Sequence, residues 1–159
     1  MKPRVYIETT IASAYHETRS DAETVARRIW TRKWWDEKRA DYDLFTSEAV
    51  MVELERGEYL HPVEAIEFLR ELPVLSIESR VRDAAAEYIR QLVMPSDPQG
   101  DAIHLAVASV HECDFLLTWN CRHLANANKY GHIQKINAAL NLFVPMLITP
   151  LHLLPEESP

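Results

Sequence analysis

The chain has 159 residues, a length that fits one domain and leaves little room for a second. With 47% hydrophobic and 26% charged residues, the composition excludes a disordered or low-complexity chain. The formal net charge of -7 argues against a general nucleic-acid binder, but it is compatible with an enzyme that recruits metal ions with carboxylates. The sequence has no apolar signal segment and no run that could span a bilayer, so we expect a cytoplasmic protein with two reduced cysteines.

Strand-like and helix-like segments alternate along the chain. Apolar, β-branched and aromatic runs predict strands at 4–7, 42–46, 74–77, 115–118 and 146–148. Apolar residues at helical spacing predict a helix that begins at 11 and further helices at 21–38, 48–56, 61–72, 79–93, 99–110 and 128–142. This alternation predicts an α/β fold, a three-layer α/β/α sandwich with a mainly parallel sheet. We expect 1–154 to form the single domain and 155–159 a flexible C-terminal tail.

Two polar residues fall where predicted strands end. Glu8 follows the strand at 4–7, and Asn120 lies just past the strand at 115–118. Ligands of open parallel sheets bind beyond the carboxyl ends of the strands, so both residues are candidates for a binding site. The alternative for Glu8 is structural, with its carboxylate capping the following helix through the backbone amides near Thr10.

Glu53 lies beside the apolar stripe that Val50 and Leu54 form on a predicted helix. An unpaired carboxylate at the border of a buried face is costly, so Glu53 requires a cation, a hydrogen-bond network or a metal ion. The structural alternative is a salt bridge to an arginine such as Arg4 or Arg56.

Asp101 lies in the first turns of the predicted helix at 99–110, which is apolar nearly all round and is expected to be buried. Asp97 and Pro98 already supply the cap and the first helical residue, so Asp101 is not needed for capping. His104 lies one turn further along the same face. We interpret it as a half-buried histidine that hydrogen-bonds within the fold, with a metal ligand or a base as the alternative.

The carboxylates of Glu8, Glu53 and Asp101 are expected to converge at one edge of the sheet. Like charges a few ångströms apart raise each other's pKa and oppose folding. A hard divalent cation removes that conflict, and an all-oxygen shell selects Mg²⁺ or Mn²⁺. Such an ion can activate water, orient a phosphodiester and stabilise charge on the leaving oxygen, so these residues indicate a metal-dependent nuclease.

At these positions the sequence resembles the PIN-domain family, the fold of VapC-type toxin ribonucleases. The resemblance covers the chain from Val5 to about Leu151 and rests on four blocks. They are Val5-Tyr6-Ile7-Glu8-Thr9-Thr10, Thr46-Ser47-Glu48 through Val52-Glu53-Leu54, Gly100-Asp101-Ala102-Ile103-His104-Leu105-Ala106-Val107-Ala108 and Phe115-Leu116-Leu117-Thr118-Trp119-Asn120. The third block is the most specific, because it looks like the family's hallmark helix.

The resemblance implies a metal-dependent ribonuclease that acts on single-stranded RNA, often the toxin of a bacterial toxin–antitoxin pair. Carried over residue by residue, Glu8, Glu53 and Asp101 are the ligands of Mg²⁺ or Mn²⁺, and Asn120 is a catalytic positioning group. Thr9 or Thr10 supports Glu8 by hydrogen bonding. The partners implied are RNA, an antitoxin protein and a second copy of the chain in a homodimer, with no membrane.

Two residues depart from the family's pattern. The opening acid is usually aspartate, and Glu8 is one methylene longer; the fourth position is often aspartate, and here it is Asn120. The lost negative charge predicts weaker metal affinity. The alternative function is therefore a catalytically weakened module of the same fold that binds RNA or a protein partner. A phosphatase or receiver-like pocket would need an aspartate after the first strand, and Glu8 argues against it.

Basic and aromatic residues gather in and just after the predicted helix at 21–38. The basic ones are interpreted as a solvated helix face, with a phosphate-contacting rim as the alternative; they are Arg27, Arg28, Arg32, Lys33, Lys38 and Arg39. Because Trp34 and Trp35 are adjacent, we expect one in the core and the other exposed or in an interface. Trp119 is expected either to pack in the core or to stack on a base.

Overall fold

The computed structural model describes residues 1–96 and 100–156. Within them, five parallel strands form one sheet in the order β3-β2-β1-β4-β5. The strands are β1 (Arg4–Ile7), β2 (Asp43–Ser47), β3 (Val74–Leu75), β4 (Phe115–Leu117) and β5 (Met146–Ile148). The predicted parallel α/β sandwich is thereby confirmed.

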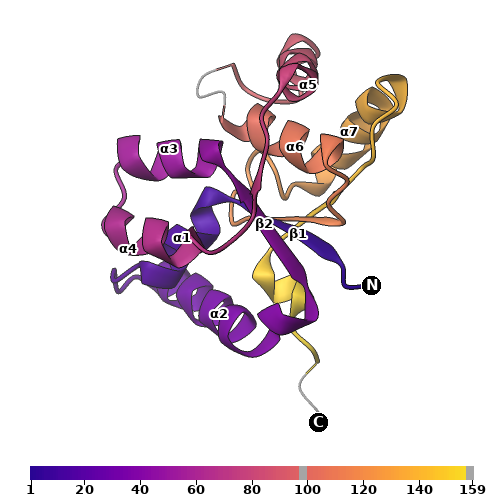
Figure 1. The fold of residues 1–159 in the computed structure, drawn as a ribbon. Coiled ribbons are helices and arrows are strands. Elements are labelled where there is room, and N and C mark those ends of the chain that lie inside the picture. The colour runs from indigo at the N-terminus through magenta and orange to yellow at the C-terminus, as the bar shows by residue number, and fades with distance from the viewer. Residues whose placement is uncertain (97–99, 157–159) are drawn as a thin grey trace.

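The helices connect the strands and cover both faces of the sheet. They are α1 (Thr9–His16), α2 (Ala22–Lys38), η1 (Arg39–Asp41), α3 (Glu48–Arg56), α4 (Pro62–Leu69), α5 (Ser79–Arg90), α6 (Gly100–Val110), α7 (Ala127–Ala139) and η2 (Pro150–Leu153). Helices α1 and α2 lie on one side of the sheet, and α6 and α7 lie on the other (Figure 1). Among the described residues, no helix combines the length and the apolarity that crossing a membrane requires.

The strand order reverses at β1, because the chain runs outward through β2 and β3 and then returns to place β4 on the other side of β1. In an open parallel sheet this reversal leaves a crevice beyond the carboxyl ends of the two neighbouring strands. Helix α3 lies at this edge and contacts both α1 and α6. The sheet topology thus brings the ends of β1 and β4 together with α3 and the start of α6.

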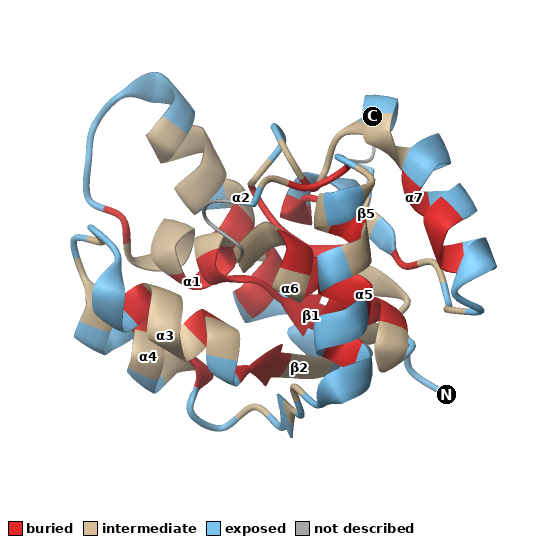
Figure 2. Cartoon of the chain, turned by 90° about the horizontal axis from the view of Figure 1, so that it is seen from above, coloured by how far each residue is buried: buried red, intermediate tan, exposed pale blue. Residues whose placement is uncertain are grey.

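The centre of the core consists of β1 and α6 (Figure 2). Val5, Tyr6 and Ile7 are all 0% exposed, as expected for a strand covered on both faces. Helix α6 is buried along almost its whole length, which its small alanines allow because they let the helix pack closely on its neighbours.

Several predicted element ends differ from the structure. Helix α4 ends at Leu69 rather than Leu72, and β3 contains only Val74 and Leu75. Helix α5 ends at Arg90, three residues early, and Leu92 then adopts a φ of 59°, a left-handed conformation that cannot continue the helix. The predicted cap at Asp97 and Pro98, and the last residues of the predicted tail, 157–159, lie outside the described residues.

The prediction that only one of two adjacent tryptophans is in the core is wrong, since Trp34 is 0% exposed and Trp35 only 4%. Helix α2 is covered on two sides, so Trp34 packs against Tyr42 while Trp35 packs against Phe68. Trp119 is also buried, and its indole N–H donates to Thr31 Oγ1 (2.7 Å). The core-packing alternative for Trp119 is therefore confirmed.

Candidate metal centre

Glu8 leaves β1 directly into α1, so its side chain lies at the reversal point of the sheet. The carboxylate is only 2% exposed. Its Oε2 atom accepts hydrogen bonds from the hydroxyls of Thr10 (2.6 Å) and Thr118 (2.8 Å), and from the Thr10 amide (3.1 Å). The predicted capping of the following helix by the Glu8 carboxylate is therefore observed. Among the described residues, Oε1 has only a longer contact to the same amide (3.3 Å), so it keeps lone pairs for a cation.

Burial raises the pKa of Glu8, and the hydrogen bonds from Thr10 and Thr118 offset this only in part. The protein therefore holds a carboxylate in a place where its charge is costly unless a cation is near.

Glu53 projects from α3 between α1 and α6. Thr9 donates to its Oε2 atom (2.8 Å), and the His104 ring lies 2.6 Å from its Oε1 atom. Burial raises the pKa of Glu53, but His104 and Thr9 outweigh burial and hold the pKa below its ordinary value. The alternative of a salt bridge to Arg4 or Arg56 is wrong for the residues described: Glu53 is paired with His104 instead.

Gly100 is the reason why Glu53 can approach the start of α6. A Cβ atom at this position would lie 2.2 Å from Glu53 Oε1 and 3.0 Å from its Cδ atom. Any larger residue would therefore displace the carboxylate. The sequence contains Gly100 in the third block of the resemblance, but only the structure shows the contact that requires a glycine.

Asp101 follows in the first turn of α6 and is only partly buried. The Asn120 amide donates to its Oδ1 atom (2.9 Å), while the Asn120 oxygen accepts from the His123 backbone amide (3.0 Å). Burial raises the pKa of Asp101, against the influence of His104. Asn120 thus holds Asp101 in place by hydrogen bonding and is itself fixed by the turn that follows β4.

His104 is completely buried, more than the half-buried position we expected. Its Nδ1 atom is hydrogen-bonded to the Tyr6 hydroxyl (2.7 Å), which is bonded in turn to Ser47 Oγ (2.7 Å). Burial lowers the pKa of His104, but Glu53, with Glu8 and Asp101, outweighs burial and raises it. The interpretation of His104 as hydrogen-bonded within the fold fits, although its partner is a candidate metal ligand.

Side chains from three parts of the chain, the end of β1, α3 and the first turns of α6, therefore lie near one another at one edge of the sheet. Potential ligand atoms of Glu8, Glu53 and His104 all lie within 4.8 Å of one another. Asp101 is not in this tight group, but it lies close enough to affect the pKa of His104. Carboxylate oxygens together with one imidazole nitrogen are a donor set that fits a divalent cation. We name these four side chains the acidic cluster: Glu8, Glu53, Asp101 and His104.

Tyr59 is a neighbour of the acidic cluster that sequence analysis missed. Burial, together with the charges of Glu8, Glu53 and Asp101, raises its pKa to about 12. The phenol therefore remains neutral at physiological pH and can donate a hydrogen bond beside the carboxylates. Tyr59 lies after the end of α3 in a segment with no periodic pattern, so no sequence signal marked it.

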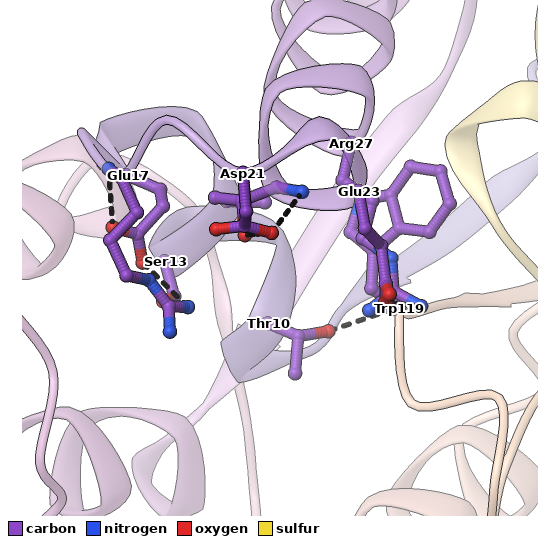
Figure 3. Close-up of a pocket in the computed structure, with 10 residues that line it drawn as sticks. Thr10, Ser13, Glu17, Asp21, Glu23, Arg27 and Trp119 are labelled. Carbon is purple, nitrogen blue, oxygen red and sulfur yellow. Dashed lines mark hydrogen bonds and ion pairs between the residues drawn. The ribbon is translucent and has the colours of Figure 1, made fainter.

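A polar hollow of ≈ 370 Å³ is lined by Thr10, which contacts Glu8 of the acidic cluster; Figure 3 shows the residues that line this hollow. Thr10 lies between the two, because its hydroxyl donates to Glu8 and accepts from the Trp119 backbone amide (2.8 Å). The Arg27 guanidinium lies 5.3 Å from the Trp119 ring and pairs with Glu23. A second hollow of ≈ 240 Å³ shares some of its lining residues and extends to Tyr59.

The fold and the acidic cluster together define an α/β protein with a candidate divalent-metal centre at the reversal point of a parallel sheet. The family model of the PIN domain matches residues 5–128. The chain therefore belongs to the PIN-domain family, whose fold is that of nucleases that generally depend on metal ions. A search of the curated proteins found no match.

Proposed function

We propose that the protein is a metal-dependent endoribonuclease that hydrolyses phosphodiester bonds in single-stranded RNA. The observation that carries this proposal is the convergence of Glu8, Glu53 and His104, with Asp101 beside them, at the carboxyl edge of the central strand in a chain of the PIN-domain family. Near neutral pH such a group of carboxylates needs a cation to offset their mutual repulsion.

The roles follow from the hydrogen bonds of each side chain. Glu8, Glu53 and Asp101 would hold Mg²⁺ or Mn²⁺, with Thr10 fixing the Glu8 carboxylate and Thr9 fixing that of Glu53. Asn120 acts as a positioning residue, because its amide holds Asp101 in place. When bound, the ion would supply Lewis-acid activation of water and of the phosphodiester.

The polar hollow next to Thr10 supports the choice of a nucleic-acid substrate. Arg27 lies on its rim over Trp119, and Arg19 lines both hollows; each is paired with a glutamate, Glu23 and Glu17, that an RNA phosphate would replace. A strand that follows the two hollows would present its phosphates to these arginines while one phosphodiester contacts the acidic cluster. Tyr59 lines the second hollow and would donate a hydrogen bond to such a phosphate there.

A toxin of the VapC type is the finer proposal. Support comes from the resemblance of the four sequence blocks and from the net charge of -7, which suits an antitoxin with a basic segment. The test is co-purification with the product of the neighbouring open reading frame, a small DNA-binding protein on this proposal. Size-exclusion chromatography with light scattering, with and without that protein, would also test the proposed homodimer.

Cleavage of an unstructured RNA across a Mn²⁺ titration tests the nuclease function. We expect Mn²⁺-dependent endonucleolytic products, with a loss of at least about 100-fold in Asp101→Asn, since even the partners of metal ligands contribute 10–100-fold. Asp83→Asn removes an exposed carboxylate from α5 and is the matched control, with activity unchanged. Equal cleavage by the parent and Asp101→Asn would assign the products to a contaminating nuclease.

The second candidate is a catalytically weakened module that binds RNA or a protein. The observation that favours it concerns Asn120, whose amide nitrogen and oxygen are both hydrogen-bonded within the protein. Position 120 therefore provides no fourth carboxylate for the ion. RNA binding without cleavage at saturating Mn²⁺, in both the parent and Asn120→Asp, would select this candidate.

A further inference from the structure

His104 has a chemical property that the proposed ligands leave unused: a buried imidazole nitrogen directed at the carboxylates. We propose that His104 Nε2 is itself a ligand of the metal ion and makes the centre selective for Mn²⁺ and other transition-metal ions over Mg²⁺. This inference rests on the proposed metal site.

The contact between His104 and Glu53 carries the argument. His104 Nε2 and Glu53 Oε1 are both ligand atoms, and they lie only 2.6 Å apart. A nitrogen and an oxygen that both carry lone pairs approach this closely only when a hydrogen or a cation lies between them. In the metal-free protein a hydrogen has that role, and a divalent cation that replaced it would be held by the same two atoms.

The position of His104 on α6 gives a second, independent observation. His104 follows Asp101 by three residues, so the two side chains lie one above the other on the same face of the helix. An acidic residue and a histidine at this spacing are a recurring way to bind one ion from a single helix, as in the carboxylate–histidine sites of helical bundles. Glu8 provides a further carboxylate ligand, which approaches from the end of β1.

The other ring nitrogen has the support that metal-binding histidines require. His104 Nδ1 is hydrogen-bonded to the Tyr6 hydroxyl, and Tyr6 to Ser47, with all three side chains buried. Hydroxyl groups donate or accept, so this chain can reverse and accept a hydrogen bond from Nδ1–H when Nε2 binds a cation. These hydrogen bonds therefore fix the orientation of the imidazole ring, but they allow either ring nitrogen to carry the proton.

The ligand set decides which ion the centre prefers. Mg²⁺ requires nearly ideal octahedral oxygen coordination, whereas imidazole suits transition-metal ions. A centre with one nitrogen among carboxylate oxygens therefore binds Mn²⁺ more tightly than Mg²⁺.

Pulsed electron paramagnetic resonance on the Mn²⁺-loaded protein measures nitrogen coordination directly, and titration calorimetry with Mn²⁺ and Mg²⁺ measures affinity. We expect a coupling to a bound imidazole nitrogen that is lost in His104→Gln. In that variant Mn²⁺ affinity should fall about 10-fold or more, the effect that substitutions of residues around a metal ion typically have. Mg²⁺ affinity should stay nearly unchanged.

The control is His123→Gln, because His123 also acts electrostatically on Asp101 but belongs to no ligand group among the described residues. The nitrogen coupling should persist in His123→Gln, and this result supports His104 even if His104→Gln does not fold. Mn²⁺ binding without any nitrogen coupling, or a coupling lost in His123→Gln, overturns the role of His104 and leaves the proposed nuclease intact. Calorimetry that shows no binding of either ion at a site sensitive to Glu53→Gln overturns the metal site of the proposed function as well.

Discussion

Helix α6 carries two buried polar groups of opposite character. At its start, Asp101 and His104 belong to the acidic cluster; near its end, Ser109 belongs to a neutral cluster with Tyr88 and Asn137. In the neutral cluster the Tyr88 hydroxyl donates to Asn137 Oδ1 (2.5 Å), and Asn137 Nδ2 donates to Ser109 Oγ (3.0 Å) and to the Phe143 carbonyl (2.8 Å). Every donor of the Asn137 amide is used within the protein.

The two clusters are both buried, and they differ in whether their polar atoms are satisfied by hydrogen bonds within the protein. The neutral cluster joins α5, α6 and α7 with uncharged, satisfied hydrogen bonds, so it stabilises the fold. The acidic cluster has more lone pairs than protein donors, and burial raises the pKa of Glu8 and Asp101, so without a cation these two carboxylates oppose folding. Substitutions in the two clusters should therefore change stability in opposite directions.

The largest effect is expected in the neutral cluster. Asn137→Ala removes the donor to the Phe143 carbonyl and leaves the Tyr88 hydroxyl with only its longer bond to Ser109 (3.2 Å), so it should lower the free energy of unfolding by about 1–3 kcal/mol. Urea denaturation measures the change, and the gain in stability on adding Mn²⁺ should stay that of the parent. Gln134→Ala removes an exposed amide from the same helix as a control, and an equal loss there would contradict the assignment.

In the acidic cluster, Glu8→Gln should raise the free energy of unfolding of the metal-free protein at pH 7 by about 1–2 kcal/mol, because it removes a buried charge. The pKa of Glu8 is raised by folding, so the native protein binds this proton more tightly than the unfolded chain. The stability of the parent should therefore fall as the pH rises above the unfolded value of about 4.3.

Urea melts in a chelator across this pH range test the effect of Glu8. In Glu8→Gln this part of the pH dependence should disappear, and so should most of the stabilisation by Mn²⁺. A metal-free Glu8→Gln protein that is less stable than the parent would show that the hydrogen bonds from Thr10 and Thr118 outweigh the cost of the buried charge.

A smaller effect is expected for Asn120→Asp. The change replaces an N–H that donates to Asp101 by a second carboxylate, so the metal-free protein should lose about 1 kcal/mol of stability. With Mn²⁺ the order should reverse, since the added charge strengthens cation binding. Asn126→Asp makes the same change at the N-cap of α7, where the lost bond to the Arg122 carbonyl is offset by a negative charge at the helix N-terminus, so the change should be nearly neutral.

The smallest stability effects distinguish two glycines within helices. Gly131→Ala places a methyl group in open space and should stabilise the protein by about 0.5–1 kcal/mol. Gly100→Ala should show little net change, because the same gain is offset by displacement of the Glu53 side chain. Calorimetry should nevertheless show weaker Mn²⁺ binding in Gly100→Ala alone, and equal Mn²⁺ affinities in the two variants would contradict the role of Gly100.

Local sequence patterns predicted most of the fold and several parts of the candidate site. The buried strands at 4–7 and 115–118 and the helix that contains Asp101 were recognisable because hydrophobic periodicity reports burial directly. Burial of both Trp34 and Trp35 was not predictable in this way, because it depends on α2 being covered on two sides by elements distant in the sequence.

By itself, the sequence determined that this is a parallel α/β domain with acidic residues at a strand end and on two helices, since those features depend on local chain chemistry. Only the tertiary structure decided which atoms meet. The reversal of strand order at β1 brings Glu8, Glu53 and His104 within 4.8 Å, and the missing Cβ of Gly100 leaves room for Glu53. The physical reason is that contacts across tens of residues depend on packing geometry, which no local pattern along the chain encodes.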